Sequence, residues 1–209
     1  MTLSNYKNIL WDFDGVIIDS MPIRELGFVK IFEGYDKEKV EQLVAYHRAN
    51  GGMSRFAKIR YFFEELLHTS ISEEEVYAYA DRFSEIMREL LCDKNLLIRD
   101  CVDYIAHNAA THNYHLVSAS AQDELRFLAQ QLGIAHFFKS IVGSPTKKAD
   151  NIKNILAEYG YAHAETCLIG DSHNDEDAAG KNDIQFFGYN AAELEASKKS
   201  PYIKTFSSL

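Results

Sequence analysis

The spacing of hydrophobic residues changes twice along the chain, and each change marks a different kind of element. Residues 6–13 contain a short apolar run that ends in Asp-Phe-Asp-Gly, which predicts a buried strand running into a turn. From residue 20 to residue 91 apolar side chains recur at helical spacing, with breaks near Gly34 and residues 50–52. This stretch predicts a bundle of about four helices, the last of them beginning at a capping box of Ser72 and Glu75.

Helices and strands alternate in the remainder of the chain, which is typical of a parallel sheet covered by helices. A helix is expected over residues 121–132, with Ser120 as its N-cap and Gly133 just past its end. The strands expected here cover residues 114–117, 140–142, 166–169 and 184–187, and a short strand with a polar end is expected over 201–209. The pattern therefore predicts an α/β core, residues 1–19 and 96–209, interrupted by a helical block, residues 20–95.

Composition and charge exclude several classes of protein. The 209 residues include 22 Lys and Arg against 31 Asp and Glu, so the formal net charge of −9 argues against a nucleic-acid partner. No apolar run approaches the roughly 18 residues that span a bilayer, and the first ten residues lack the layout of a signal peptide. We therefore expect no membrane partner and a cytoplasmic location. The three cysteines show no CxxC spacing and predict neither a disulfide framework nor a zinc site.

Two aspartates follow the first predicted strand directly. Asp12 and Asp14 are two residues apart, so both side chains can point to the same face at the carboxyl end of that strand. One interpretation is a carboxylate nucleophile with a second carboxylate for proton transfer. The alternative is a turn in which an aspartate caps the next helix.

Further polar residues follow the later strands. Ser118 ends the second strand, Lys147 and Lys148 follow the third, and Asp171 and Asp175 follow the fourth. Ligands bind at the carboxyl ends of the strands in open α/β sheets, so the joint placement favours one site over a set of unrelated helix caps. Carboxylates gathered there would suit Mg²⁺.

These motifs resemble those of the haloacid dehalogenase-like superfamily, which consists mostly of Mg²⁺-dependent phosphatases. Asp12-Phe-Asp-Gly-Val matches its first motif, Ser118 the second, a lysine near Lys148 the third, and residues 170–175 the fourth. The third motif departs from the commoner Lys-Pro form, so Lys147 remains an alternative to Lys148. The resemblance implies a Rossmann-like doubly wound parallel sheet with an inserted helical cap domain of the kind found in beta-phosphoglucomutase and phosphoglycolate phosphatase relatives.

The resemblance also implies a role for each matching residue. Asp12 would be the nucleophile that forms an aspartyl-phosphate, and Asp14 would protonate the leaving oxygen and then activate water. Ser118 and Lys148, with Ala119 beside them, would hold the phosphoryl group. Mg²⁺ would be bound by Asp12, Asp14 through its carbonyl, and Asp171, with Asp175 in support.

Residues of the predicted cap suggest contacts to the rest of the substrate. Gly52-Met53-Ser54-Arg55 resembles the specificity loop of beta-phosphoglucomutase, so Arg55 is a candidate for a second anion contact, although an exposed arginine at a helix start is the alternative. Arg24 stands where the mutase relatives carry a histidine, which disfavours a mutase, and it could contact an anionic substrate. His47, Arg48 and Lys58 could enlarge a cationic patch.

The function expected from the sequence is a Mg²⁺-dependent phosphomonoesterase that hydrolyses a small phosphorylated metabolite through an aspartyl-phosphate. Two alternatives are a phosphomutase of the beta-phosphoglucomutase type and a non-catalytic protein that senses a ligand in the same pocket. Retention of both Asp12 and Asp14 argues against the second alternative. The sequence leaves open whether the protein is a monomer or a homodimer.

Overall fold

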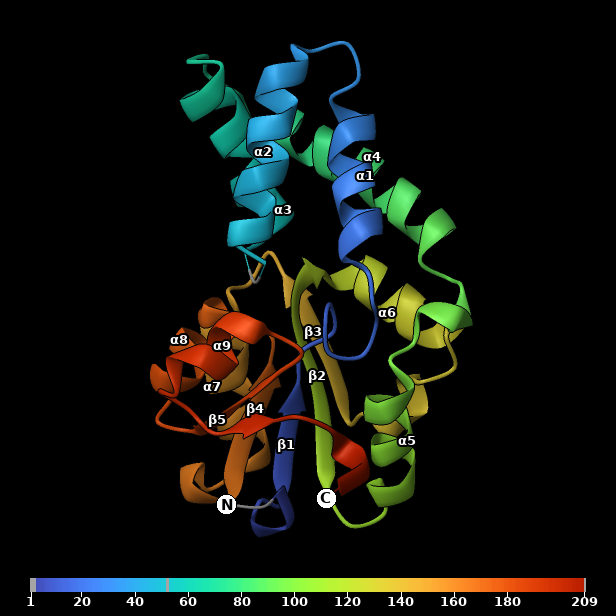
Figure 1. Ribbon diagram of the computed structural model, residues 1–209, viewed down its shortest axis with the longest axis vertical. Helices are drawn as coiled ribbons and strands as arrows, with labels where there is room; N and C mark the ends of the chain where they lie inside the picture. The colour runs from blue at the N-terminus through green and yellow to red at the C-terminus, as the bar shows by residue number, and fades with distance from the viewer. Residues whose placement is uncertain (1–2, 52, 209) are drawn as a thin grey trace.

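A parallel β-sheet forms the centre of the computed structural model, which describes residues 3–51 and 53–208 (Figure 1). The sheet formed by these residues has six strands in the order β3-β2-β1-β4-β5-β6. Trp11 on β1 pairs in register with Leu116 on one side and Ile169 on the other. The strands are β1 Asn8–Trp11, β2 Asn113–Ala121, β3 Ser140–Ser144, β4 Thr166–Gly170, β5 Gln185–Tyr189 and β6 Tyr202–Ile203.

Helices cover both faces of the sheet because its strands are apolar on both faces. Ile9 and Trp11 belong to the same buried cluster as residues of α5 and α6, whereas Leu10 packs with residues of α7 and α8. The predicted Rossmann-like, doubly wound α/β fold is thereby confirmed. The helices of the core are α5 Arg99–Asn108, α6 Gln122–Gln131, α7 Lys148–Tyr159, α8 His173–Gly180 and α9 Ala192–Ser197.

The helical block inserted after β1 lies beyond the carboxyl ends of the strands (Figure 1). Aromatic rings fill its interior, with Phe28 and Phe83 4.6 Å apart and Phe32 and Phe62 4.0 Å apart between ring centres. The capping box of Ser72 and Glu75 starts its last helix, as the sequence predicts. The block consists of α1 Met21–Ile31, α2 Lys37–Ala49, α3 Arg55–Tyr61, a π-helical turn Phe62–Leu66 and α4 Glu73–Leu90.

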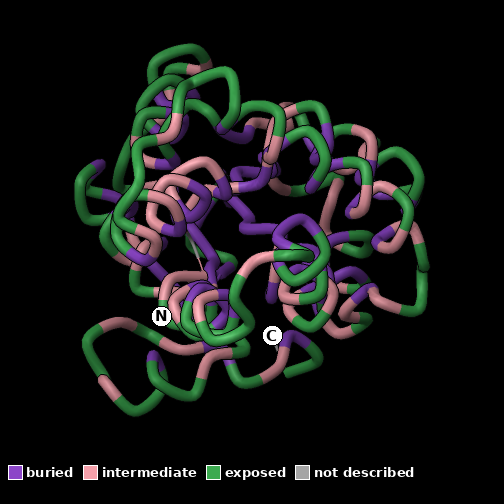
Figure 2. Tube along the Cα trace, turned by 90° about the horizontal axis from the view of Figure 1, so that it is seen from above, coloured by how far each residue is buried: buried purple, intermediate pink, exposed green. Residues whose placement is uncertain are grey.

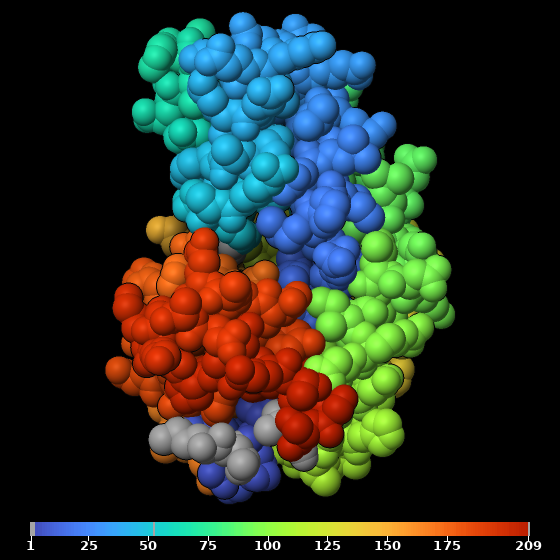
Figure 3. Space-filling view, in the orientation of Figure 1, coloured from blue at the N-terminus to red at the C-terminus, as the bar shows by residue number. Residues whose placement is uncertain are grey.

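The block packs directly on the core, and the segments that connect the two lie side by side. In the space-filling view the block covers the upper end of the core (Figure 3). Seen from above, buried backbone runs through the middle of the molecule and exposed backbone surrounds it (Figure 2). Asp19 N donates to Leu96 O at 2.8 Å, and Ile98 N donates to Ile17 O at 2.9 Å. The division into a core domain, residues 1–19 and 96–209, and a cap domain, residues 20–95, stays a prediction.

The second strand is longer than the sequence pattern predicts. β2 continues through Ala121, which is also the N-cap residue of α6, so the prediction that Ser120 caps this helix is wrong. The Ser-Ala-Ser-Ala end of β2 has no apolar alternation, and the pattern therefore places the strand end too early. Among the described residues, no helix is both long and apolar enough to cross a membrane.

Candidate active site

The centre of the site is a buried lysine between two carboxylates. Asp12 leaves β1 with its backbone N–H bonded to Ile169 O on β4, at 2.9 Å, and it is only 4% exposed. Lys148 Nζ lies 2.7 Å from Asp12 Oδ1 and donates a hydrogen bond to Asp175 Oδ1. Burial alone would lower the pKa of Lys148, but the two carboxylates outweigh it and raise that pKa above its ordinary value. Lys147 is exposed, so the lysine at the site is Lys148.

Three carboxylates meet at this edge of the sheet. One oxygen each from Asp12, Asp171 and Asp175 lies within 4.8 Å of the others. Burial and the neighbouring charge of Asp175 raise the pKa of Asp12 to about 7, although Lys148 acts in the opposite direction. Burial and the charges of Asp12 and Asp175 raise the pKa of Asp171 well above its usual range.

This donor set fits a hard divalent cation. Carboxylate oxygens are the ligands that Mg²⁺ prefers, and one lysine ammonium cannot neutralise three carboxylates, of which Asp12 and Asp175 are buried and Asp171 is half-buried. Gly15 leaves room for the cluster: its φ of +75° favours glycine, and a Cβ at this position would lie 1.9 Å from Asp171 Oδ2. Asp12, Asp171 and Asp175 are therefore the residues whose side chains could hold the metal.

Asp14 is surrounded by three hydrogen-bond donors, two from the start of α1 and one from the end of β2. Ser20 Oγ donates to its Oδ1 at 2.5 Å, Arg24 Nε donates to the same oxygen at 2.8 Å, and Ser120 Oγ donates to Oδ2 at 2.7 Å. Burial would raise the pKa of Asp14, but Arg24 and the hydrogen bonds from these donors lower it to about 2. The carboxylate is thus held ionised, in the state that accepts a proton.

Ser118 and Ala119 complete the wall around the carboxylates. Both line a cavity of about 10 Å³ together with Asp12, Lys148 and Asp171. Ser118 is 1% exposed, and its Oγ accepts a hydrogen bond from Ser120 N at 3.0 Å, which leaves its O–H free to donate to a bound group. All the residues predicted for phosphoryl and metal binding in the core are therefore close together.

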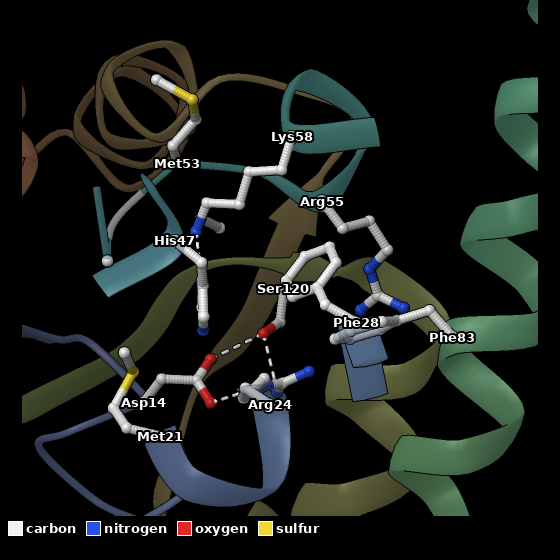
Figure 4. A pocket seen from close by; sticks show the side chains of 12 residues that line it. Asp14, Met21, Arg24, Phe28, His47, Met53, Arg55, Lys58, Phe83 and Ser120 are labelled. Atoms are coloured by element: carbon white, nitrogen blue, oxygen red, sulfur yellow. Dashed lines mark hydrogen bonds and ion pairs between the residues drawn. The ribbon is translucent and has the colours of Figure 1, made fainter. Parts of the chain in front are cut away.

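A second cavity, of about 40 Å³, continues from Asp14 into the helical block (Figure 4). Its wall includes both arginines that the sequence singles out, and Glu124 of α6 pairs with each of them. Arg24 Nη1 donates a hydrogen bond to Glu124 Oε1 at 2.6 Å. Arg55 Nη2 and Glu124 Oε2 form an ion pair at 2.5 Å, but these two atoms are not aligned for a hydrogen bond. Arg55 also donates to Ser84 Oγ at 2.5 Å. Both guanidinium groups are therefore paired with protein acceptors.

Two of the cationic candidates from α2 and α3 lie in the wall of this cavity, and one does not. Lys58 is 2% exposed and His47 is 4% exposed, and Lys58 Nζ lies 2.7 Å from His47 Nδ1. Arg48 points outward, with 62% of its side chain exposed, and pairs with Glu25 on α1. Of the predicted specificity loop, Met53 lines the cavity, whereas Gly52 lies outside the described residues.

Three residues of the site are not assigned to it by the sequence analysis, which names only Ser120 among them, as a helix cap. Glu124, Ser120 and Ser20 surround Arg24 and Asp14, but none belongs to the motifs that match the superfamily. Glu124 is in the first turn of α6, where acidic residues are common on solvent-exposed faces. Only the packing of the helical block over α6 makes this position a buried one.

Comparison with known proteins agrees with this geometry. The model of the haloacid dehalogenase-like hydrolase family matches residues 9–189, and the chain belongs to that family. The prediction of an enzyme of the hydrolase class is thereby confirmed. A phosphoglycolate phosphatase from Pasteurella multocida (strain Pm70) is 23% identical over 181 residues, which are 83% of this chain and 80% of the relative.

Solved structures of two other proteins have the same fold. Beta-phosphoglucomutase from Clostridium difficile superimposes with a TM-score of 0.76 at 18% identity, covering 98% of this chain and 93% of the other. CbbY from Rhodobacter sphaeroides, in complex with xylulose-(1,5)bisphosphate, gives a TM-score of 0.76 at 16% identity, covering 98% and 96%. At these identities the likeness concerns the fold alone.

Proposed function

We propose that this protein is a Mg²⁺-dependent phosphatase that hydrolyses small phosphorylated metabolites through a phosphate ester of Asp12. The observation that carries the proposal is the buried contact between Asp12 and Lys148 beside two further carboxylates. The similarity to a phosphoglycolate phosphatase supports the reaction class. We further propose that the helical block, α1–α4, acts as the cap over this site.

In the first half of the reaction an oxygen of Asp12 attacks phosphorus, and the bond between phosphorus and the substrate's bridging oxygen breaks. Lys148 and Ser118, which line the same small cavity as Asp12, would hold the phosphoryl oxygens. Asp12, Asp171 and Asp175 would hold Mg²⁺, which when bound neutralises charge on the transferring group. The leaving alcohol takes up one proton, and Asp14 is the residue that would donate it. Asp14 can carry this proton only after it has lost some of the hydrogen-bond donors that keep its carboxylate ionised.

In the second half, water attacks the phosphorus of the aspartyl-phosphate and Asp12 is the leaving group. Asp14 is the base in this step: its carboxylate is ionised at neutral pH, and it takes a proton from the attacking water once it has lost some of the donors that lower its pKa to about 2. The helical block lies above the strand ends (Figure 3), and as a cap it would limit access of other water molecules to the site. The products are inorganic phosphate and the free alcohol.

The direct test is release of inorganic phosphate from a panel of phosphorylated metabolites, measured with and without Mg²⁺. We expect release that depends on the metal and is confined to small monoesters. A mutase would instead give a product phosphorylated at a new position with little free phosphate. Tight binding of a phosphorylated compound with neither outcome would support a ligand sensor and contradict the proposal.

The affinity for Mg²⁺ is expected to rise with pH through about pH 7. The metal needs ionised ligands, and the pKa of Asp12 is raised to about 7 while that of Asp171 is also raised. Calorimetric titrations from about pH 5.5 to about pH 8.5, in buffers of different ionisation enthalpy, would measure the affinity and the protons released. An affinity that does not change over this range would contradict the prediction.

The raised pKa of Asp12 also predicts how the free energy of unfolding changes with pH when no metal is bound. Because the pKa of Asp12 is higher in the folded protein than in the unfolded chain, this group stabilises the fold at about pH 4 and below, and that contribution is lost as the pH rises towards 7. Bound Mg²⁺ should reverse the trend, since it favours the ionised form. Urea unfolding at each pH, with and without the metal, measures both effects.

A further inference from the structure

The buried cationic side chains around the second cavity outnumber the carboxylates that pair with them by one. Arg24 pairs with Asp14 and Glu124, and Arg55 pairs with Glu124. Lys58 also lines this cavity, yet no carboxylate among the described residues forms an ion pair with it. Three cations against two carboxylates leave one positive charge, and that charge belongs to Lys58.

The neighbour of Lys58 adds a second unused donor. A lysine ammonium can only donate, so His47 Nδ1 accepts from Lys58 and the ring proton is then on Nε2. His47 Nε2 is buried and has no hydrogen-bond partner within residues 3–51 and 53–208, and His47 as a whole is 4% exposed. Burial lowers the pKa of Lys58 to about 7, and burial with the charge of Lys58 lowers that of His47 to about 3. Unpaired buried donors of this kind are costly unless a ligand completes them.

We infer that Lys58 and His47 Nε2–H bind the carboxylate at the far end of a short phosphorylated acid, whose phosphoryl group lies at Asp12. This inference rests on the proposed phosphatase function and names its substrate class. One excess positive charge matches one carboxylate, and a cavity of about 40 Å³ admits only a few non-hydrogen atoms. Arg55 is the candidate that the sequence indicates for a second anion contact, but Arg55 is already paired with Glu124. We therefore assign the contact with the substrate carboxylate to Lys58.

The experiment compares two substrates that differ in one group. Phosphoglycolate and ethyl phosphate have the same length, but the first ends in a carboxylate and the second in a methyl group. We expect the unmodified enzyme to prefer phosphoglycolate, and Lys58→Met to lower kcat/KM for it by about 10- to 100-fold, the loss of a hydrogen bond to a charged group. The rate with ethyl phosphate should change by less than about threefold. An equal loss with both substrates, or none with either, would overturn the inference.

Two further variants separate this contact from general effects. Arg48→Met removes one positive charge from the neighbouring, exposed position on α2, and it should leave the preference unchanged. His47→Phe keeps an aromatic ring against Phe28 but removes the Nε2 donor, and it should reduce the preference for phosphoglycolate in the same direction as Lys58→Met. A loss of preference in Arg48→Met equal to that in Lys58→Met would assign the effect to long-range charge and overturn the inference.

Binding measurements distinguish failure of the inference from failure of the proposed function. Calorimetry with phosphoglycolate and with ethyl phosphate, on the unmodified protein and on Lys58→Met, requires no turnover. If neither compound is hydrolysed but phosphoglycolate binds more tightly in a manner that depends on Lys58, the subsite stands and the phosphatase proposal fails. If both are hydrolysed equally by both proteins, the phosphatase proposal stands and the subsite fails.

Discussion

Replacement of Asp12 by asparagine is expected to lower the rate of phosphate release by about 10⁵-fold or more. The amide lacks the charge that makes the carboxylate a nucleophile, and loss of a nucleophile in other enzymes costs rates of this order. The side chain keeps its size, so the asparagine should fit beside Lys148 without a change in packing. Phosphate release from the best substrate of the panel is the measurement, with circular dichroism to confirm that the variant is folded.

A matched control shows whether the effect is specific to this position. Asp177→Asn also removes one aspartate charge, but Asp177 is exposed on α8, and its one ion-pair partner in the described part of the chain is Lys181, at 2.6 Å. This variant should retain activity within about twofold, because exposed ion pairs contribute little. Retention of more than about one hundredth of the activity in Asp12→Asn would reject Asp12 as the nucleophile.

Glu124→Gln is expected to lower the free energy of unfolding by about 3–5 kcal/mol. Glu124 is fully buried and faces both Arg24 and Arg55, so the neutral amide leaves two buried guanidinium groups with too few negative partners. Removal of one partner from a buried ion pair has this order of cost. Urea denaturation at neutral pH, monitored by tryptophan fluorescence and by circular dichroism, would measure it.

The neighbouring residue offers the control for this variant. Asp123 is exposed in the same turn of α6, and Asp123→Asn should change the free energy of unfolding by no more than about 0.5 kcal/mol. A loss of less than about 1 kcal/mol in Glu124→Gln would mean that the two arginines find other partners. It would also weaken the argument that Glu124 prevents Arg55 from serving as the anion contact.

The strands and the joint position of Asp12, Ser118, Lys148 and Asp171 could be predicted from the sequence because both depend on local pattern. Apolar runs mark the buried strands, and the carboxyl end of each parallel strand faces the same edge of the sheet. The choice between Lys147 and Lys148 could not be made in this way. Adjacent residues at a helix start point in different directions, and only the packed structure shows which one reaches Asp12.

Burial of charged residues was the part of the site that could not be predicted from the sequence. Lys58 and His47 occupy helical positions where a polar residue normally faces solvent, and their burial results from contacts among α1, α2 and α3. The ionised state of Asp14 has a similar origin, since its donors come from residues 6, 10 and 106 positions further along the chain. Such partners are brought together by tertiary structure alone.

The position of β1 in the middle of the sheet has a consequence for how the chain folds. Asn8 on β1 pairs with Asn113 on β2, 105 residues later, and β4 on its other side follows later still. During synthesis β1 therefore emerges from the ribosome well before either neighbour exists, while α1–α4 can already form their local contacts. We expect the helical block to fold first and to hold the apolar strand Asn8–Trp11 near the position at which its partners arrive.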